Sequence, residues 1–362
     1  MIPLTKTNID IIMGHIFNEL YQFSYSLAHA KIKAFAPPFL DYLNGDKDII
    51  QYLNDLFNRY YSKLSKLKRI DWVNDGLHEI IKHCSNKEID FNLSRDAKIL
   101  GDAILASLEA YYEGLPSKAF QILQNVFLQN DRHFINMLPQ IEATAMKGFR
   151  VREGSHYNKI TDLFHIPFEL RHKCSSYRFS ILGFPSLYLA ESLPTALNEV
   201  RAKSDNDFCI TQYEYNGEIA LIDLALIPRQ MQLWEIYSQL MFYPLIAACG
   251  LKVKNENSPF KPEYVIPQLF FQIVKMDMPE FAGVSYISTR SANPDFTDMR
   301  QRNYVLFVPE TSLTKGYSSQ LAEKLTACDP ICIKYNDDIK TLIQYEVECA
   351  LRPKKSITIN SK

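Results

Sequence analysis

Glycine is scarce in this chain, with 12 among 362 residues. Neither G-x-G-x-x-G nor G-x-x-x-x-G-K-[ST] occurs, although these are the sequences whose backbone holds phosphates in dinucleotide-binding and P-loop folds. The chain therefore belongs to neither of these two nucleotide-binding classes.

Histidine is missing from the second half, because none follows His172. A Ser-His-Asp or Cys-His hydrolase would have to recruit its histidine from the first half, which disfavours that class. His78 and His83 are five residues apart, about 500° of helix rotation, so they diverge where a zinc-binding pair four apart would converge. Cys328 and Cys332 have no second pair, which makes a zinc knuckle a poor interpretation. We expect no metal site.

Signals for export or membrane insertion are also lacking. The longest apolar run, residues 240–251, is too short to cross a bilayer and contains a proline, and the first twenty residues lack the apolar core of a secretory signal. Seven cysteines, an odd number, form no disulfide framework and are typical of a reducing compartment. We expect a cytoplasmic protein without membrane contact.

Charge of either sign is not in excess, since 40 Lys and Arg face 41 Asp and Glu, for a net charge of −1. Such a balance does not indicate a general nucleic-acid or membrane-surface binder. The hydrophobic share of 47% and the charged share of 22% are ordinary for a globular protein, and the length suits two domains.

Residues 1–140 follow a helical period of apolar residues. Helices are predicted at 10–35, at 46–67 and as a hairpin over 97–130, in which Gly114 ends one helix and the next begins at Ser117. We interpret this part as a helical interaction or regulatory domain.

Residues 147–355 change to short β runs broken by turns. The runs 208–215 and 218–226 flank Asn216-Gly217, a strong signal for a β-hairpin. The predicted class is α+β, without strict βαβ alternation. Further strands are expected at 283–288, 303–308 and 331–335, and helices at about 229–247 and 262–275.

The densest stretch runs from Arg178 to Arg201. It passes through a turn into the strand 187–190 and then into a helix entered at Ser192, with Glu199 expected one turn inside that helix. An arginine, a strand tyrosine and this glutamate can then face one pocket.

Four motifs in order resemble the RES domain, a family named for an arginine, a glutamate and a serine. They are F-R-V at 149–151, R-F-S-x-x-G at 178–183, L-Y-L-A-E-S-x-x-x-A-x-x-E at 187–199 and G-V-S-Y-I-S at 283–288. The resemblance covers roughly residues 147–310 and leaves residues 1–140 outside.

The resemblance implies a fold similar to the ADP-ribosyltransferases and cleavage of the nicotinamide–ribose bond of NAD, with NAD as substrate. Family toxins deplete NAD by hydrolysis or phosphorolysis, and other members modify a protein. By position, the RES arginine is Arg150, the RES glutamate Glu199 and the RES serine Ser288. Arg178 and Tyr188 would be the second arginine and the tyrosine of the NAD pocket.

The chemistry suits these residue types. Breaking this bond passes through an oxocarbenium-like state, and nicotinamide is a cationic leaving group that needs no general acid. Glu199 would bind the ribose 2′-hydroxyl and stabilise the developing positive charge. Arg150 and Arg178 suit the pyrophosphate, the Tyr188 ring suits nicotinamide, and Ser288 suits the nicotinamide amide or the ribose.

Several alternatives stay open. Arg152 lies on the same strand face as Arg150 and could take its role. The acceptor of ADP-ribose is water, phosphate or a macromolecule, so the chain is an NAD-consuming toxin or antiphage defence effector, or an ADP-ribosyltransferase acting on a protein or nucleic acid. A non-catalytic helical adaptor with an inactive RES-like domain is the remaining reading. The helical domain is expected to bind an inhibitor, an antitoxin or a sensor protein, and a homo-oligomer is a further expectation.

Overall fold

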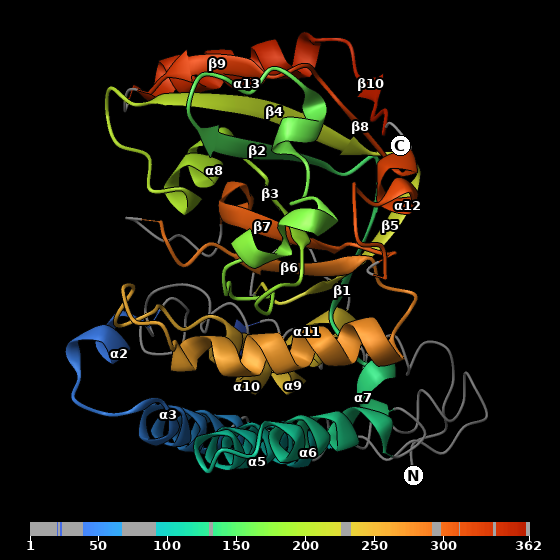
Figure 1. Ribbon diagram of the computed structural model, residues 1–362. Helices are drawn as coiled ribbons and strands as arrows, with labels where there is room; N and C mark the ends of the chain where they lie inside the picture. The colour runs from blue at the N-terminus through green and yellow to red at the C-terminus, as the bar shows by residue number, and fades with distance from the viewer. Residues whose placement is uncertain are drawn as a thin grey trace, which may run out of the picture. The chain divides into compact units, whose positions relative to one another are not determined.

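The computed structural model in Figure 1 describes most of the chain. The predicted helix at 10–35 falls outside the described residues except for three positions, and the His78–His83 motif falls outside them entirely. Within the described ranges, no helix is both long and apolar enough to cross a membrane. The described residues are 20, 22–23, 39–66, 92–129, 133–225, 233–291, 298–310, 312–335 and 338–359.

The chain forms two compact units, one of residues Met1–Pro139 with Leu226–Leu269 and one of Gln140–Ala225 with Phe270–Lys362. The first unit is helical, and α11 passes from it into the second unit. Its elements are α2 (Leu40–Asn44), α3 (Ile49–Leu64), α5 (Leu93–Tyr112), α6 (Pro116–Leu128), α7 (His133–Asn136), α9 (Leu233–Met241), α10 (Tyr243–Cys249), a 3-10 turn (Pro262–Tyr264) and α11 (Val265–Asp277).

Local sequence explains where these helices begin and end. Asp48 caps α3 by accepting the backbone N–H of Gln51, and the apolar stripe of α3 is buried as predicted. Gly114 adopts a left-handed φ of 80° between α5 and α6, which any side chain would resist. The next helix begins at Pro116, one residue before the predicted start, because proline is well suited to the first helical turn.

Residues 226–269 group with the helical unit, whereas the sequence analysis placed them in the second domain. The described side chains of α9 and α10 are almost all buried, so these helices have no polar face for solvent and must be covered on every side. Tyr60 of α3 supplies part of that cover. Its hydroxyl donates to the Leu240 carbonyl at 2.6 Å, and its ring stacks on Tyr243 with centroids 4.2 Å apart.

The second unit is built on a mixed sheet in the order β1-β5-β6-β7-β3-β2-β4-β8-β10, with β9 also pairing β4. Among the strand pairs of the described residues, β5–β6 alone is parallel. The unit therefore has the predicted α+β class. Its strands are β1 (Gln140–Thr144), β2 (Lys147–Glu153), β3 (Ser186–Ala190), β4 (Asp207–Tyr215), β5 (Glu218–Asp223), β6 (Gly283–Ile287), β7 (Arg302–Phe307), β8 (Leu325–Ala327), β9 (Ile331–Lys334) and β10 (Lys355–Ser356); its helices are α8 (Leu193–Glu199), α12 (Ser319–Glu323) and α13 (Ile339–Leu351).

The predicted β-hairpin at Asn216-Gly217 is wrong, although both strands exist. β4 pairs with β2, and β5 pairs with β1, so the two predicted partners do not pair with each other. Gly217 has a φ of 88°, and its carbonyl accepts the N–H of Ala145 at 3.2 Å. Gly217 therefore marks a kink between β4 and β5, and Ala145 marks the matching bend between β1 and β2. The chain does not reverse at Asn216-Gly217.

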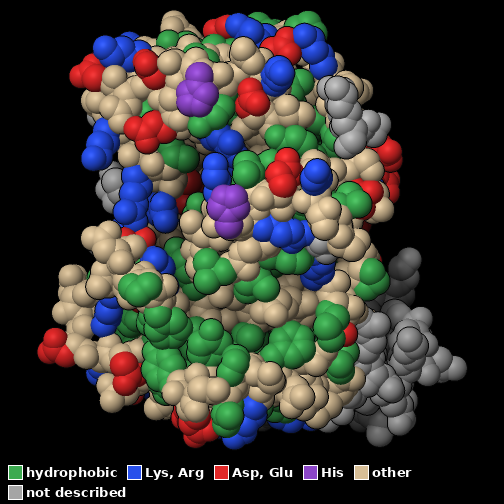
Figure 2. Space-filling view, viewed as in Figure 1, with side chains coloured by type: hydrophobic (Ala, Val, Ile, Leu, Met, Phe, Trp, Pro, Cys, Tyr) green, Lys and Arg blue, Asp and Glu red, His purple; other side chains and the backbone are tan. Residues whose placement is uncertain are grey.

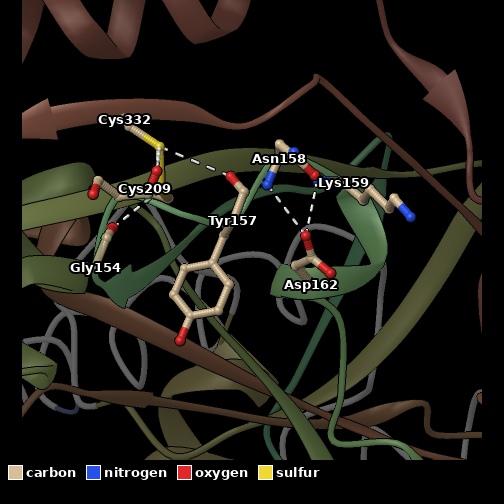
Figure 3. Close-up of a disulfide and its surroundings, with 8 residues drawn as sticks. Gly154, Tyr157, Asn158, Lys159, Asp162, Cys209 and Cys332 are labelled. Atoms are coloured by element: carbon tan, nitrogen blue, oxygen red, sulfur yellow. Dashed lines mark hydrogen bonds between the residues drawn. A yellow bond between two sulfur atoms is a disulfide. The ribbon is translucent and has the colours of Figure 1, made fainter.

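The expectation of no disulfide is also wrong. Cys209 of β4 and Cys332 of β9 face each other across the sheet and are joined (Figure 3). The pair lies against the loop that follows β2, near the carbonyls of Gly154 and Tyr157. Two residues 123 apart in sequence became partners only through strand pairing, which cysteine spacing does not reveal.

Candidate functional site

Glu199 is the seventh and last residue of α8, so it lies at the C-terminal end of a short helix rather than one turn inside a longer one. The helix begins at its cap Ser192, whose hydroxyl donates to the Arg300 carbonyl at 2.8 Å. Thr195 makes a second bond to the same carbonyl at 2.8 Å. The apolar side of α8, including Leu197, packs in a core cluster with residues of β2 and β3. These contacts fix the direction in which the helix end points.

Three residues from β6 and β7 or just beyond them surround the Glu199 side chain. Its Oε1 accepts hydrogen bonds from Ser288 Oγ at 2.6 Å and from Asn303 Nδ2 at 2.7 Å. Its other oxygen, Oε2, faces the guanidinium of Arg290, with Nε 3.6 Å away. The carboxylate is thus held firmly by one oxygen and electrostatically by the other.

The position of Glu199 is unfavourable for a carboxylate. A helix C-terminus carries partial negative charge and leaves carbonyls without partners, so an anion there is repelled. Arg290 compensates for both effects. Its Nη1 donates to the Glu199 carbonyl at 2.6 Å, and its Nε faces the negatively charged carboxylate. A carboxylate kept at such a place by dedicated partners indicates a functional residue more than a solvated one.

Arg150 lies on β2, where its Nη1 donates to the carbonyl of Tyr188 on β3 at 2.9 Å. Its Nε is buried and has no hydrogen-bond partner among the described residues. Burial, helped by the nearby charge of Arg152, lowers the pKa of Arg150 to about 10, which leaves it cationic at neutral pH. Arg152 points instead toward the ring of Tyr157, 5.7 Å from its centroid. Arg150 is the arginine that reaches β3.

Tyr188 and Arg178 are linked through the turn that precedes β3. The Tyr188 hydroxyl accepts the N–H of Phe179 at 3.1 Å and lies 3.3 Å from the hydroxyl of Ser180. Arg178 itself is buried and donates through Nη2 to Thr289 Oγ1 at 3.0 Å. Tyr188 therefore braces the segment that carries Arg178, and Arg178 reaches the chain directly after Ser288.

The five residues singled out by sequence thus meet in one region of the second unit. The chain of contacts runs from Arg150 to Tyr188, from there to the Arg178 turn, and through the 288–290 segment to Glu199. In Figure 2, Lys and Arg side chains gather beside a recess in this part of the molecule. No group of three or more His, Cys, Asp or Glu side chains able to hold a metal was found in the described part of the chain.

Two residues of this arrangement were missed by the sequence reasoning. Asn303 is the second residue of β7, and Arg290 lies two residues beyond Ser288. The only signal for Arg290 was its closeness in sequence to Ser288. For Asn303, only the pairing of β6 with β7, which sets Tyr286 opposite Asn303, brings the amide to the site.

Residues 148–320 match the RES domain. This part of the chain belongs to the RES domain family. The chain is also 25% identical over 311 residues to the Bacillus subtilis (strain 168) protein named "Putative toxin YopC", a match that covers 79% of this chain and 66% of that relative. No solved structure gives a significant match. The five residues that the sequence analysis predicted for the pocket lie inside the matched range.

Proposed function

We propose that this protein is an NAD-consuming enzyme that breaks the nicotinamide–ribose bond and acts as a toxin. The observation that carries the proposal is Glu199, an ion-paired carboxylate oriented by Ser288 and Asn303 inside a RES domain. The name of the Bacillus subtilis relative supports the toxin role. NAD is the substrate.

Each side chain has a task in this reaction. The C1′–N1 bond of the nicotinamide ribose breaks, and its electron pair leaves with nicotinamide, which becomes neutral. Glu199 stabilises the positive charge that develops on the ribose, and its fixed direction avoids reorganisation during the step. Ser288 and Asn303 hold Oε1, so Oε2 is the oxygen left to face the ribose.

The arginines supply positive charge for the anionic part of the substrate. Arg150 has a buried nitrogen without a described partner and lies beside Tyr188, which suits it to an anionic group such as the pyrophosphate. A molecule bearing nicotinamide, ribose and pyrophosphate matches this combination of carboxylate, aromatic ring and guanidinium. The helical unit binds the partner that restrains the toxin.

The test is product analysis from NAD. Purified protein is incubated with NAD, with and without phosphate, and nicotinamide, ADP-ribose and its 1″-phosphate are separated by chromatography. Nicotinamide release that disappears in Glu199→Gln is expected. ADP-ribose as co-product indicates water as acceptor, and the phosphate ester indicates phosphorolysis. Label transferred from radioactive NAD to a macromolecule in a cell lysate would identify an ADP-ribosyltransferase instead, and the absence of all three would refute the proposal.

A further inference from the structure

Arg290 occupies the face of Glu199 that the proposed reaction needs. Since Oε1 is engaged by Ser288 and Asn303, the ribose must approach Oε2, yet this oxygen faces the Arg290 guanidinium at 3.6 Å. A cation at that place opposes the positive charge that develops on the ribose. The arrangement seen here is therefore unsuited to the transition state unless Arg290 moves.

The ion pair between Arg290 and Glu199 is accessible to solvent. The side chains of Arg290 and Glu199 are 23% and 29% exposed, so water reaches both and screens their attraction. Partly exposed ion pairs contribute little to stability, so separating one costs little free energy. Phosphate oxygens bind a guanidinium in a bidentate manner and carry more charge than one carboxylate, which makes a pyrophosphate the stronger partner.

We propose that Arg290 is a substrate-operated latch, which pairs with Glu199 in the empty site and transfers to the pyrophosphate when the dinucleotide binds. This inference rests on the proposed function and adds a residue to it. In NAD the pyrophosphate is attached to the nicotinamide ribose, so a substrate whose ribose meets Glu199 brings its pyrophosphate toward Arg290, which pairs with Glu199. Binding of the anionic part of the substrate thereby exposes the carboxylate to the ribose, and molecules without a pyrophosphate leave the latch closed.

The latch differs from a purely structural helix cap in its kinetic signature. Arg290→Gln, which removes the charge, is expected to raise KM for NAD at least tenfold while kcat stays the same or rises, because Glu199 no longer has a competing cation. Arg290→Lys keeps the charge without the bidentate fork and should give an intermediate KM. Arg352→Gln is the matched control, since Arg352 is a partly exposed arginine paired with Glu348 on the last turn of α13.

Binding measurements separate this inference from the proposed function. Calorimetry with ADP, which has the pyrophosphate but no nicotinamide ribose, should show at least a tenfold loss of affinity in Arg290→Gln and no change in Arg352→Gln. Nicotinamide affinity should be unaffected in both. A wild type that binds ADP but leaves NAD intact would refute the proposed function alone. Unchanged ADP affinity, or a fall in kcat with unchanged KM, would show that Arg290 only caps α8 and would overturn the latch.

Discussion

Two arginine–carboxylate pairs lie on opposite faces of the same strands, β6 and β7. On one face Arg302 donates to Asp223 at 3.1 Å, and Ser285 Oγ lies 3.3 Å from the same carboxylate. On the other face Glu199 has Ser288 and Arg290. Arg302 and its neighbour Asn303 point to opposite sides, as successive strand residues do, so β7 contributes to both groups.

The two groups share a carboxylate, a serine and an arginine, and differ in access. The Asp223 and Arg302 side chains are 3% and 2% exposed, against 29% and 23% for Glu199 and Arg290. A pair that solvent does not reach can have only a structural role, whereas a solvent-accessible pair can exchange its partner for a substrate. The difference teaches that residue type does not separate a structural site from a reactive one, and that solvent access does.

The largest effect is expected from Asp223→Asn, which leaves the Arg302 charge buried without its partner. The free energy of unfolding should fall by about 3–5 kcal/mol, measured by urea denaturation. Combining Asp223→Leu with Arg302→Met removes both charges, and this double variant should be more stable than either single one. A loss below about 1 kcal/mol in Asp223→Asn would break the comparison, since the closed pair would then be dispensable.

Glu199→Gln should lower the activity strongly and the stability only slightly. Nicotinamide release is expected to fall about a hundredfold or more, equivalent to ~3 kcal/mol of lost transition-state stabilisation. The free energy of unfolding should change by less than about 1 kcal/mol, because a partly exposed pair contributes little. Equal losses of stability in Glu199→Gln and Asp223→Asn would contradict the assignment of different roles to the two faces.

His165 is a second buried polar group, and its contribution to stability can be tested through pH. Its Nδ1 donates to the Ile166 carbonyl at 2.8 Å, and its Nε2 accepts the N–H of Ser318 at 2.9 Å, so the ring is held neutral. Burial lowers its pKa from 6.5 to about 4, with smaller effects from the charges of Arg150, Arg171 and Glu310.

Because the pKa of His165 is lower in the folded protein than in the unfolded one, the unfolded state takes up the proton first as the pH falls. The free energy of unfolding is therefore highest above pH 6.5 and decreases as the pH falls toward 4. Between pH 7 and pH 4.5 the loss should be about 2.5 kcal/mol, measured as the difference in urea unfolding between wild type and His165→Gln. Parallel pH profiles of the two proteins would show that His165 does not titrate in this way.

The smallest effect is expected from Asn303→Ala, which removes one of the two donors to Glu199 Oε1. Nicotinamide release should fall about tenfold, or ~1.4 kcal/mol in the barrier, because Ser288 still holds the carboxylate. Asn198→Ala is the control, as this exposed amide precedes Glu199 on α8 without contacting it through any described hydrogen bond. Full activity in Asn303→Ala would mean that Ser288 alone positions Glu199.

The helical periods, the strand runs and the order of the RES motifs were all readable from sequence. Local signals of this kind depend on neighbours a few residues apart, and they were reliable at α3 and β6. The Asn216-Gly217 signal was also local, yet it could not tell a reversal from a kink. The choice depended on β1 and β2, which lie more than sixty residues earlier and offered longer pairing than a hairpin would.

By itself the sequence determined the α+β class, the motif positions of Arg150, Arg178, Tyr188, Glu199 and Ser288, and the absence of phosphate-binding glycine loops. Only the tertiary structure decided that Ser288, Asn303 and Arg290 meet at the end of α8, and that Asp223 and Arg302 are sealed on the other face. The reason is that strand register sets which face a side chain takes, and burial then sets its energy. Neither is encoded in the spacing of residues along the chain.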